Sequence, residues 1–519
     1  MPPLPGSTEE LLAFDALQRQ LASRYARITT DPRAEQTILV VPSLSLDPAE
    51  LAKISGVHHY EERMLYLLML LRSPRARVVY VTSQAISATV IDYFLHLLSG
   101  VPGSHARKRL SLLDCSDQSS VPLTAKILAR PRLLERIRGA LGPLDQAHMV
   151  CFNSSPLERT LAVRLGIPLY GNDPQFYALG TKSGSRDVFR EAGVLMPDGF
   201  EHLRDGEDVA EALATLQERH PGLRRAVVKL NDGFSGEGNA LFYYEGVDGS
   251  SRAERMGQIR ERLPGLRFEA RGETWERFHA KYQEMGGVVE QFVEGDLKRS
   301  PSGQCRVNAI GRAQAISTHD QVLGGPSGQV FEGCTFPADP AYRLEVQEIS
   351  LRVAAVMAHR GVVGRFGLDF VSVPDHEPDG RVSWRHYAIE INLRKGGTTH
   401  PFLTLRFLTD GNYDPESGLF FTQGGKPKYY FASDTLQSPR YRGLLPDDLI
   451  DIAVYHDLHF DAAVERGVAF HLVGALSEYG KLGMVCIGDN PQQAQFLYRK
   501  TRGVLDQETS GAGEARTGP

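Results

Sequence analysis

The stretch that decides the fold is Ala388–Pro401, AIEINLRKGGTTHP, where two polar residues alternate with isoleucines and a cationic, glycine-rich turn follows. Because side chains alternate between the two faces of a strand, Glu390 and Asn392 share one face while the isoleucines enter the core. Asp369 lies in the apolar run just upstream. Two carboxylates and an amide suit a hard cation such as Mg²⁺ that also binds phosphate. We therefore favour a metal site beside an anionic substrate over an ordinary solvated strand face.

A second motif is Val227–Asn239, VVKLNDGFSGEGN, in which a strand ends near Lys229 and a glycine-rich loop leads into another strand. Glycines let backbone N–H groups approach phosphate oxygens, and a lysine adds a point charge. A Walker loop or a Rossmann turn would lead into a helix, so neither fits. A strand–loop–strand lid over a nucleotide remains, although most glycine-rich hairpins taken alone are simple tight turns. The loop residues concerned are Gly233, Ser235, Gly236 and Gly238.

A third motif, Val288–Gly295 (VVEQFVEG), is a strand that runs into a linker. The carbonyl of Gln291 and the N–H of Val293 have the alternation needed to meet the edge of an adenine ring. Taken alone, the motif is better explained as an ordinary strand.

Together these motifs resemble the ATP-grasp superfamily in order and spacing over roughly residues 175–405. Within it, three stretches resemble the carboxylate–amine ligases that include the peptide ligase of pheganomycin biosynthesis. They are EINLRKGGTTHP (Glu390–Pro401), THDQVLGG (Thr318–Gly325) and GNDP (Gly171–Pro174).

The resemblance implies ATP as substrate and Mg²⁺ or Mn²⁺ as cofactor, with two ions. It implies that Lys182 and Lys229 bind the α and β phosphates and that the loop Gly233–Gly238 closes over the γ phosphate. Glu290 would meet the adenine amino group, within a hinge that also contains Gln291, Phe292 and Val293. The metal ligands would be Asp369, Glu390 and Asn392, and Arg394 would lie near the transferred phosphate or acyl group.

Two positions depart from the pattern of D-alanine–D-alanine ligases. Leu297 stands where those enzymes have a ribose-binding glutamate, which leaves Glu294 or Lys298 for the ribose. Gly367 stands where they have an arginine two residues before the metal aspartate, so the role of Arg365 stays open.

Other residues near these motifs are candidates for substrate contact. The stretch His319–Gln321 resembles part of a hydrolytic triad, but no nucleophile motif accompanies it, which argues against hydrolysis. For each candidate the alternative is a structural role in a strand or turn. The candidates are Arg306, His319, Lys395, Thr398 and His400.

The predicted fold is α/β, with an ATP-grasp fold between two smaller units. A Rossmann-like pre-ATP-grasp domain is expected over residues 1–174, the ATP-grasp domain over 175–405, a small α/β C-terminal domain over 406–505 and a disordered tail over 506–519. A length of 519 residues agrees with several domains.

The expected elements follow hydrophobic periodicity and turn residues. Strands are expected at Thr37–Val41, Arg77–Thr82, Met149–Phe152, Ile167–Tyr170, Ala226–Leu230, Ala240–Tyr244, Val288–Val293, Gln304–Ile310, Arg365–Val373 and Tyr387–Ile391. Helices are expected at Tyr60–Leu71, Val90–Leu98, Thr181–Ala192, Asp208–Glu218 and Leu344–His359, with an irregular, partly helical insertion over 246–286.

Composition narrows the class of protein. Charged residues make up 23%, and 58 basic residues against 63 acidic ones give a net charge of −5, which does not favour a nucleic-acid binder. The five scattered cysteines have no zinc-ribbon or disulfide spacing, which favours a reducing cytoplasm. No signal peptide is evident, and no apolar run approaches the roughly 20 residues that span a membrane.

The sequence therefore predicts a carboxylate–amine ligase that joins small molecules, such as an amino acid or a short peptide, through an acylphosphate. The alternatives are a small-molecule kinase on the same scaffold and a non-catalytic ATP-binding module. Neither the two substrates nor the oligomeric state can be read from the sequence.

Overall fold

The N-terminal region is a four-stranded parallel sheet in the order β3-β2-β1-β4. The computed structural model describes residues 2–46, 48–233, 238–270, 272–324, 330–376 and 378–510. The predicted α/β unit with a parallel sheet is confirmed. The strands are β1 (Gln36–Val41), β2 (Ala76–Thr82), β3 (Leu110–Asp114) and β4 (Ala147–Cys151). The helices are α1 (Thr8–Gln18), α2 (Leu21–Thr30), α3 (Pro48–Ala52), η1 (Val57–Arg72), α4 (Ala88–His96), α5 (Gly103–Arg107), α6 (Leu123–Leu128), α7 (Pro131–Leu141), η2 (Leu144–Gln146) and α8 (Pro156–Leu165).

The strand expected at Ile167–Tyr170 is wrong. Only an isolated bridge joins Leu169 to Met149. The side chain of Gln18 occupies both backbone groups of Leu169, donating to its carbonyl over 3.0 Å and accepting from its N–H over 2.8 Å. The backbone of Pro168 and Tyr170 still hydrogen-bonds to Met149 of β4, each over 2.8 Å, and Gln18 takes the remaining backbone groups of this short segment.

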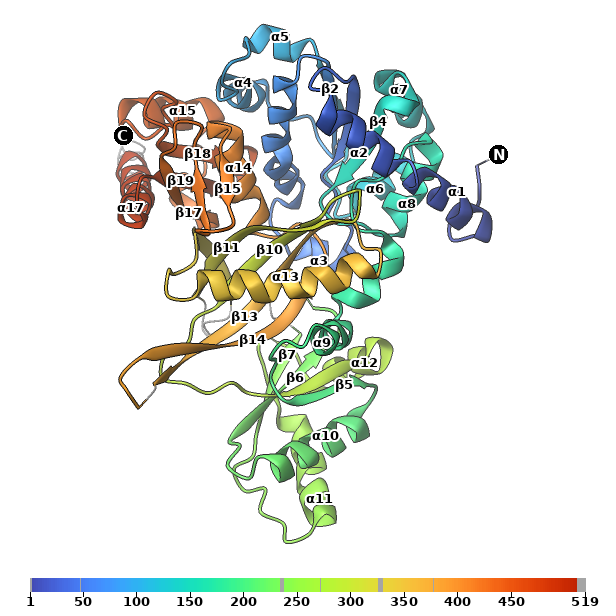
Figure 1. Cartoon of the computed structure of the whole chain (residues 1–519), viewed down its shortest axis with the longest axis vertical. Helices are drawn as coiled ribbons and strands as arrows, with labels where there is room; N and C mark the ends of the chain where they lie inside the picture. Colours follow the sequence, from blue (N-terminus) through green and yellow to red (C-terminus); the bar gives the residue numbers. More distant parts are fainter. Residues whose placement is uncertain are drawn as a thin grey trace, which may run out of the picture.

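A five-stranded antiparallel sheet, in the order β5-β9-β6-β7-β8, forms a separate lobe with its helices (Figure 1). Its core contains Val228, Phe242, Phe278 and Val289. The insertion expected over 246–286 contains two regular helices, α11 and α12. The elements are η3 (Pro174–Gly180), α9 (Lys182–Glu191), β5 (Gly199–Leu203), α10 (Gly206–Arg219), β6 (Arg225–Leu230), β7 (Asn239–Tyr243), α11 (Arg252–Arg262), η4 (Leu263–Gly265), β8 (Arg267–Phe268), α12 (Trp275–Met285) and β9 (Gly287–Gln291).

The third sheet has ten strands, and it continues from the predicted ATP-grasp region into the C-terminal region. Strand β12 pairs with β17, which in turn pairs with β19. The elements are β10 (Pro301–Val307), β11 (Ala313–Gly324), β12 (Val330–Phe336), α13 (Arg343–His359), β13 (Gly364–His376), β14 (Val382–Asn392), α14 (Thr399–Thr409), β15 (Asn412–Asp414), β16 (Leu419–Phe421), β17 (Pro427–Gln437), η5 (Pro439–Tyr441), α15 (Pro446–Tyr455), β18 (Gly467–His471), η6 (Val473–Ala475), α16 (Leu476–Tyr479), β19 (Lys481–Gly488) and α17 (Pro491–Glu508).

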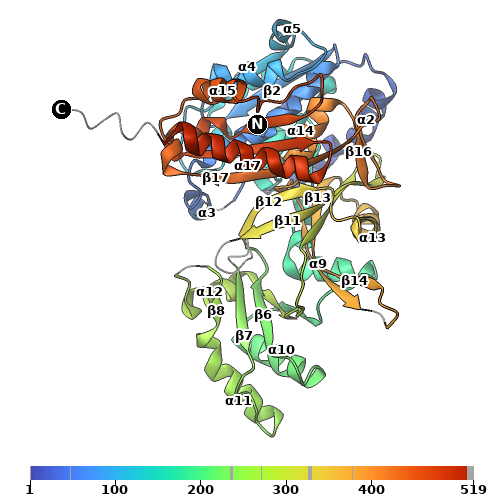
Figure 2. The ribbon, with the colours of Figure 1, turned by 90° about the vertical axis from the view of Figure 1, so that its left-hand side faces the viewer.

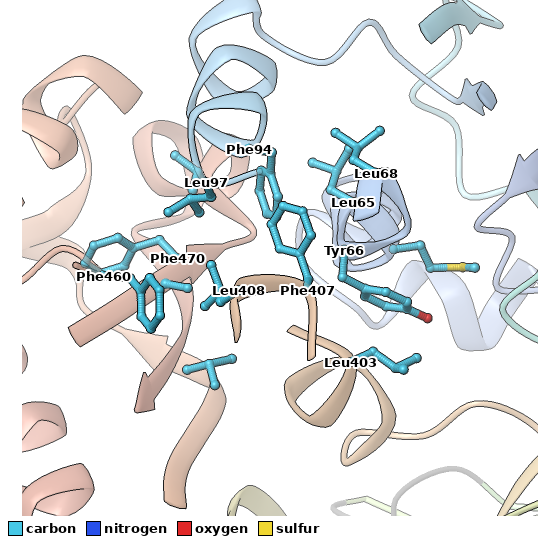
Figure 3. Close-up of a cluster of buried hydrophobic side chains, with 14 of the residues drawn as sticks. Leu65, Tyr66, Leu68, Phe94, Leu97, Leu403, Phe407, Leu408, Phe460 and Phe470 are labelled. Carbon is cyan, nitrogen blue, oxygen red and sulfur yellow. The ribbon is translucent and has the colours of Figure 1, made fainter. Parts of the chain in front are cut away.

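One apolar core joins the two ends of the chain. Figure 3 shows Leu65 and Phe94 from the N-terminal region against Phe407 and Phe470 from the C-terminal region. Since burying an aromatic or aliphatic side chain contributes roughly 1.5–3 kcal/mol, this shared core holds the two regions together.

The prediction of a disordered tail from residue 506 placed the start of the tail too early. Helix α17 lies across β17 and β19 (Figure 2) and continues to Glu508, with Leu505 fully buried. Residues 511–519 of the expected tail lie outside the described residues. Among the described residues, no helix is both long and apolar enough to cross a bilayer.

A buried carboxyl group gives the N-terminal region a pH-dependent stability. Glu61 accepts hydrogen bonds from the backbone N–H and hydroxyl of Ser83, each over 2.6 Å, but burial raises its pKa from 4.5 to about 7. The folded chain therefore binds this proton more tightly than the unfolded chain does. The free energy of unfolding should fall as pH rises from about 4.5 to about 7. Glu61→Gln should flatten this fall in urea titrations, whereas the exposed Glu135→Gln should leave it unchanged.

Candidate functional site

A cleft of about 1190 Å³ lies where the three sheets meet. The N-terminal region, the five-stranded lobe, the ten-stranded sheet and its C-terminal strands all contribute to its walls. Among the predicted site residues, those that line it are Lys182, Lys229, Gly233, Gly238, Glu290, Gln291, Phe292, Val293, Asp369, Glu390, Asn392, Arg394 and Thr398.

The three predicted metal ligands converge on one wall of this cleft. Strands β13 and β14 pair antiparallel with Asp369 opposite Glu390. The amide of Asn392 donates to Asp369 over 2.7 Å and to Glu390 over 3.2 Å. Gln321 on β11 donates to the other oxygen of Asp369 over 2.7 Å. The predicted convergence is confirmed, while the role as metal ligands stays a prediction.

The charge of this cluster is balanced by cations from two directions. Lys182, the first residue of α9, forms an ion pair with Glu390. Burial and then the charge of Lys229 lower the pKa of Lys182 to about 8. Burial raises the pKa of Asp369, an effect that Lys182 and Arg394 partly offset. The cluster therefore consists of two carboxylates held in a largely buried, cation-rich environment.

Lys229 and Glu290 belong to a buried ionic network on the opposite wall. Lys229 donates to one oxygen of Glu290 over 2.5 Å, and Arg186 on α9 donates to the other over 2.8 Å. Burial opposes ionisation of Glu290, but Lys229 and Arg186 outweigh it and hold its pKa below the ordinary value. Both oxygens of Glu290 are thus occupied, which does not support the expected contact between its side chain and an adenine amino group.

The expected hinge provides a flat, cationic surface. The guanidinium of Arg225 lies 3.8 Å from the centre of the Phe292 ring, and the ammonium of Lys298 lies 4.3 Å from it. Glu294 is held by Arg225 through two hydrogen bonds of 3.0 Å. Of the two residues considered for the ribose, Lys298 lines the cleft and Glu294 is committed to Arg225.

The ends of the glycine-rich loop approach each other closely. A Cβ atom on Gly233 would come within 3.2 Å of the backbone of Gly238, which explains why glycines stand at both ends. Ser235 and Gly236, also expected to bind ATP, lie outside the described residues.

Arg394 and Thr398 of the glycine-rich turn face the cleft. Burial lowers the pKa of Arg394, while the nearby carboxylate of Asp369 offsets part of this effect. Arg394 therefore lies next to the metal-type cluster, while its expected place near the transferred phosphate or acyl group stays a prediction.

Four of the expected substrate contacts are not supported by their positions, because these side chains do not line the cleft. Arg306 donates to Gln314, His319 is fully buried against the hydroxyl of Tyr430, Lys395 donates to the carbonyl of Cys151, and His400 contacts His471. These contacts hold the four side chains inside the fold, while the Nδ1 atoms of His319 and His400 have no hydrogen-bond partner among the described residues. Their positions therefore favour a structural role.

One wall of the cleft is formed by residues from the N-terminal and C-terminal regions of the chain, and the sequence motifs did not predict it. Arg63 on η1 pairs with Asp434 on β17 over 3.1 Å, and both are 8% exposed. Tyr60 accepts a hydrogen bond from Lys481 over 2.5 Å. All four line the cleft. Because 371 residues separate Arg63 from Asp434, no local spacing could have revealed the pair.

Comparisons with known proteins agree with this arrangement. The family model for IQCH-like ATP-grasp domains matches residues 174–246 and 253–416, and the model for the PGM1 C-terminal domain matches residues 448–501. The chain is 29% identical over 483 residues to the L-propargylglycine–L-glutamate ligase of Streptantibioticus cattleyicolor, covering 92% of this chain and 95% of that protein. It is 24% identical over 555 residues to IQ motif-containing protein H of Danio rerio, covering 96% of this chain but only 51% of that relative.

Solved structures show the same fold at low identity. The biotin carboxylase–βγ-ATP complex from Campylobacter jejuni matches with a TM-score of 0.53 and 12% identity, covering 92% of this chain and 95% of that one. The biotin carboxylase domain of the Hydrogenobacter thermophilus 2-oxoglutarate carboxylase matches with a TM-score of 0.52 and 12% identity, covering 90% and 89%. The predicted fold class is therefore confirmed.

Proposed function

Because the chain belongs to the ATP-grasp superfamily, we propose that it is an ATP-dependent carboxylate–amine ligase that releases ADP and phosphate. The observation that carries the proposal is the convergence of two carboxylates and an amide with three cations in one cleft. The cations are Lys182, Lys229 and Arg394. The relative of comparable length is itself an amino-acid ligase by name, covering 92% of this chain.

The donor set fits Mg²⁺ or Mn²⁺. Asp369 and Glu390 provide carboxylate oxygens and Asn392 an amide oxygen, the ligand types that hard cations prefer. Within the described ranges, no cluster of three His, Cys, Asp or Glu side chains could hold a metal ion. The proposed site therefore depends on the amide of Asn392 as its third ligand. We propose that two metal ions bind here. When bound, they would neutralise the negative charge of the phosphates.

The protein side chains then position the two reactants. Lys182 and Lys229 would hold the α and β phosphates; their segments meet where the N–H of Lys182 donates to the carbonyl of Asn231 over 3.0 Å. Arg394, beside Asp369, would stabilise negative charge as the substrate carboxylate attacks the γ phosphorus, and again as the amine adds to the acylphosphate and phosphate leaves. Exclusion of water during the reaction would protect the acylphosphate from hydrolysis.

The wall formed by Arg63 and Asp434 lies across the same cleft and is where we place the amino-acid substrates. A guanidinium suits a carboxylate, and a carboxylate suits an ammonium group. Asp434→Asn should raise KM for the amine about tenfold or more, while KM for ATP stays within about twofold. Steady-state kinetics with each substrate varied in turn measures both constants, and the exposed Asp451→Asn is the control. A rise confined to KM for ATP would contradict this placement.

The reaction itself is tested by incubating the chain with ATP, Mg²⁺ and pooled amino acids and short peptides. Mass spectrometry should find a condensed product together with ADP and phosphate. A stable phosphorylated product that forms without an amine would identify a kinase instead. ATP binding without turnover of any pool would identify a non-catalytic module.

Two other expectations stay proposals. We keep the domain boundaries at 174, 405 and 505, although the ten-stranded sheet runs across the second of them. We also keep a cytoplasmic location, which five buried, unpaired cysteines in the described residues support.

A further inference from the structure

Three arginines gather on the cleft-side face of the ten-stranded sheet, beyond the metal-type cluster. Arg306 on β10 and Arg365 on β13 are direct partners in the antiparallel register. Arg406 on α14 lies within electrostatic reach of both. The opposite face of these strands, with Cys305 and Phe366, packs into the core under α13. Since like charges directly opposite each other destabilise a sheet, this arrangement needs a compensating group.

The described residues provide little compensation. Arg306 donates to a neutral group, the amide oxygen of Gln314, and none of the three arginines forms an ion pair within the described ranges. The acid whose charge acts on Arg406 is Asp410, which already lies 3.8 Å from Arg72. Burial, followed by the charge of Arg306, lowers the pKa of Arg365 to about 10.

A buried hydroxyl near Arg365 has no hydrogen-bond partner. Tyr66 is 1% exposed, and its hydroxyl has no hydrogen-bond partner. Figure 3 shows this hydroxyl directed away from Phe407 and Leu65, out of the apolar cluster. Arg365 lies within electrostatic reach of it, and the hydroxyl of Tyr170 lies against Arg306. A buried hydroxyl left unpaired is destabilising, and a ligand oxygen would accept its hydrogen bond.

This group is separate from the nucleotide site. Arg365 precedes Asp369 by four residues on β13, which is about 13 Å along a strand. The pair Gln304–Gly367 lies between them, and Thr399 donates to Gln304 over 3.2 Å.

We propose that Arg306, Arg365, Arg406 and the hydroxyl of Tyr66 form a second anion site that takes an oxyanion of two or more charges. Three guanidinium groups from three elements, together with a hydroxyl donor, match the several oxygens of such a ligand. The bound anion is either free phosphate or a dicarboxylic acid. The site does not depend on the ligase reaction.

Isothermal titration calorimetry of the full chain without nucleotide tests the proposal. Inorganic phosphate and glutarate are titrated separately, at constant ionic strength set with chloride. Lys182→Ala removes a cation of the nucleotide site, and Arg365→Gln removes one of the second site. We expect binding of at least one probe to persist in Lys182→Ala and to weaken about tenfold or more in Arg365→Gln. The control Arg77→Gln, an exposed arginine on β2, should bind like the wild type.

Tyr66→Phe keeps the test decisive even where Arg365→Gln does not fold, because it removes only an oxygen without a partner. It should leave the unfolding temperature unchanged or higher and weaken anion binding about threefold or more. Tighter binding of phosphate would identify phosphate as the source, and tighter binding of glutarate would identify a carboxylate ligand. Equal binding in wild type, Arg365→Gln and Tyr66→Phe would overturn the proposal. So would loss of binding in Lys182→Ala alone, or no binding of either probe.

Discussion

Glu390→Ala should turn over ATP at least about 100-fold more slowly than the wild type. The substitution removes one of the two carboxylates of the metal-type cluster and leaves Lys182 without its ion-pair partner. With one carboxylate missing, a metal ion would lose a ligand, and the reacting phosphate would lose charge neutralisation. Release of ADP and phosphate at saturating ATP, Mg²⁺, acid and amine measures the effect.

Two companion variants make the Glu390 result specific. Glu390→Gln keeps the size of the side chain and removes its charge, so a similar loss would assign the effect to charge. Asp375→Ala removes a half-exposed carboxylate that pairs with Arg385 on the same two strands, and it should stay within about twofold of wild type. If thermal unfolding shows that Glu390→Ala is folded, phosphate release near the wild-type rate would contradict the ligase proposal.

The metal-type cluster could be predicted because its geometry is local. Alternation within β14 places Glu390 and Asn392 on one face, and the hairpin from β13 returns Asp369 to the same place. Each step depends on neighbouring residues and on the two-residue period of a strand. No contact between distant segments is needed.

The buried polar residues show the limit of such reasoning. His319 and Lys395 look like candidates for a site in sequence because they stand in polar motifs. Their roles are set by Tyr430 and by the carbonyl of Cys151, groups that are far away in the chain. Glu290 likewise follows the hinge pattern, yet Arg186 and Lys229 hold both of its oxygens.

The same distinction holds for the fold. Periodicity predicted strands such as β2 and β6 to within a residue or two, since each strand carries its own apolar pattern. It could not predict that β12 pairs with β17, which extends the ATP-grasp sheet into the C-terminal region. Pairing between distant strands depends on the assembled core, here the one that joins Leu65 and Phe470.

Lys229→Met should lower kcat/KM for ATP at least about 100-fold, because the ammonium group that would face the phosphates is lost. It should also lower the free energy of unfolding, by up to about 3–5 kcal/mol, because Glu290 loses one of its two buried partners. Urea titration and steady-state kinetics measure the two effects separately.

The double variant Lys229→Met/Glu290→Gln distinguishes catalysis from folding. Removing the charge of Glu290 as well leaves less uncompensated charge in the network, so stability should recover in part. The rate should not recover, since no cation returns to the phosphate end of the cleft. If stability and kcat/KM for ATP recovered together, Lys229 would serve only to hold Glu290, and its proposed contact with the phosphates would be contradicted.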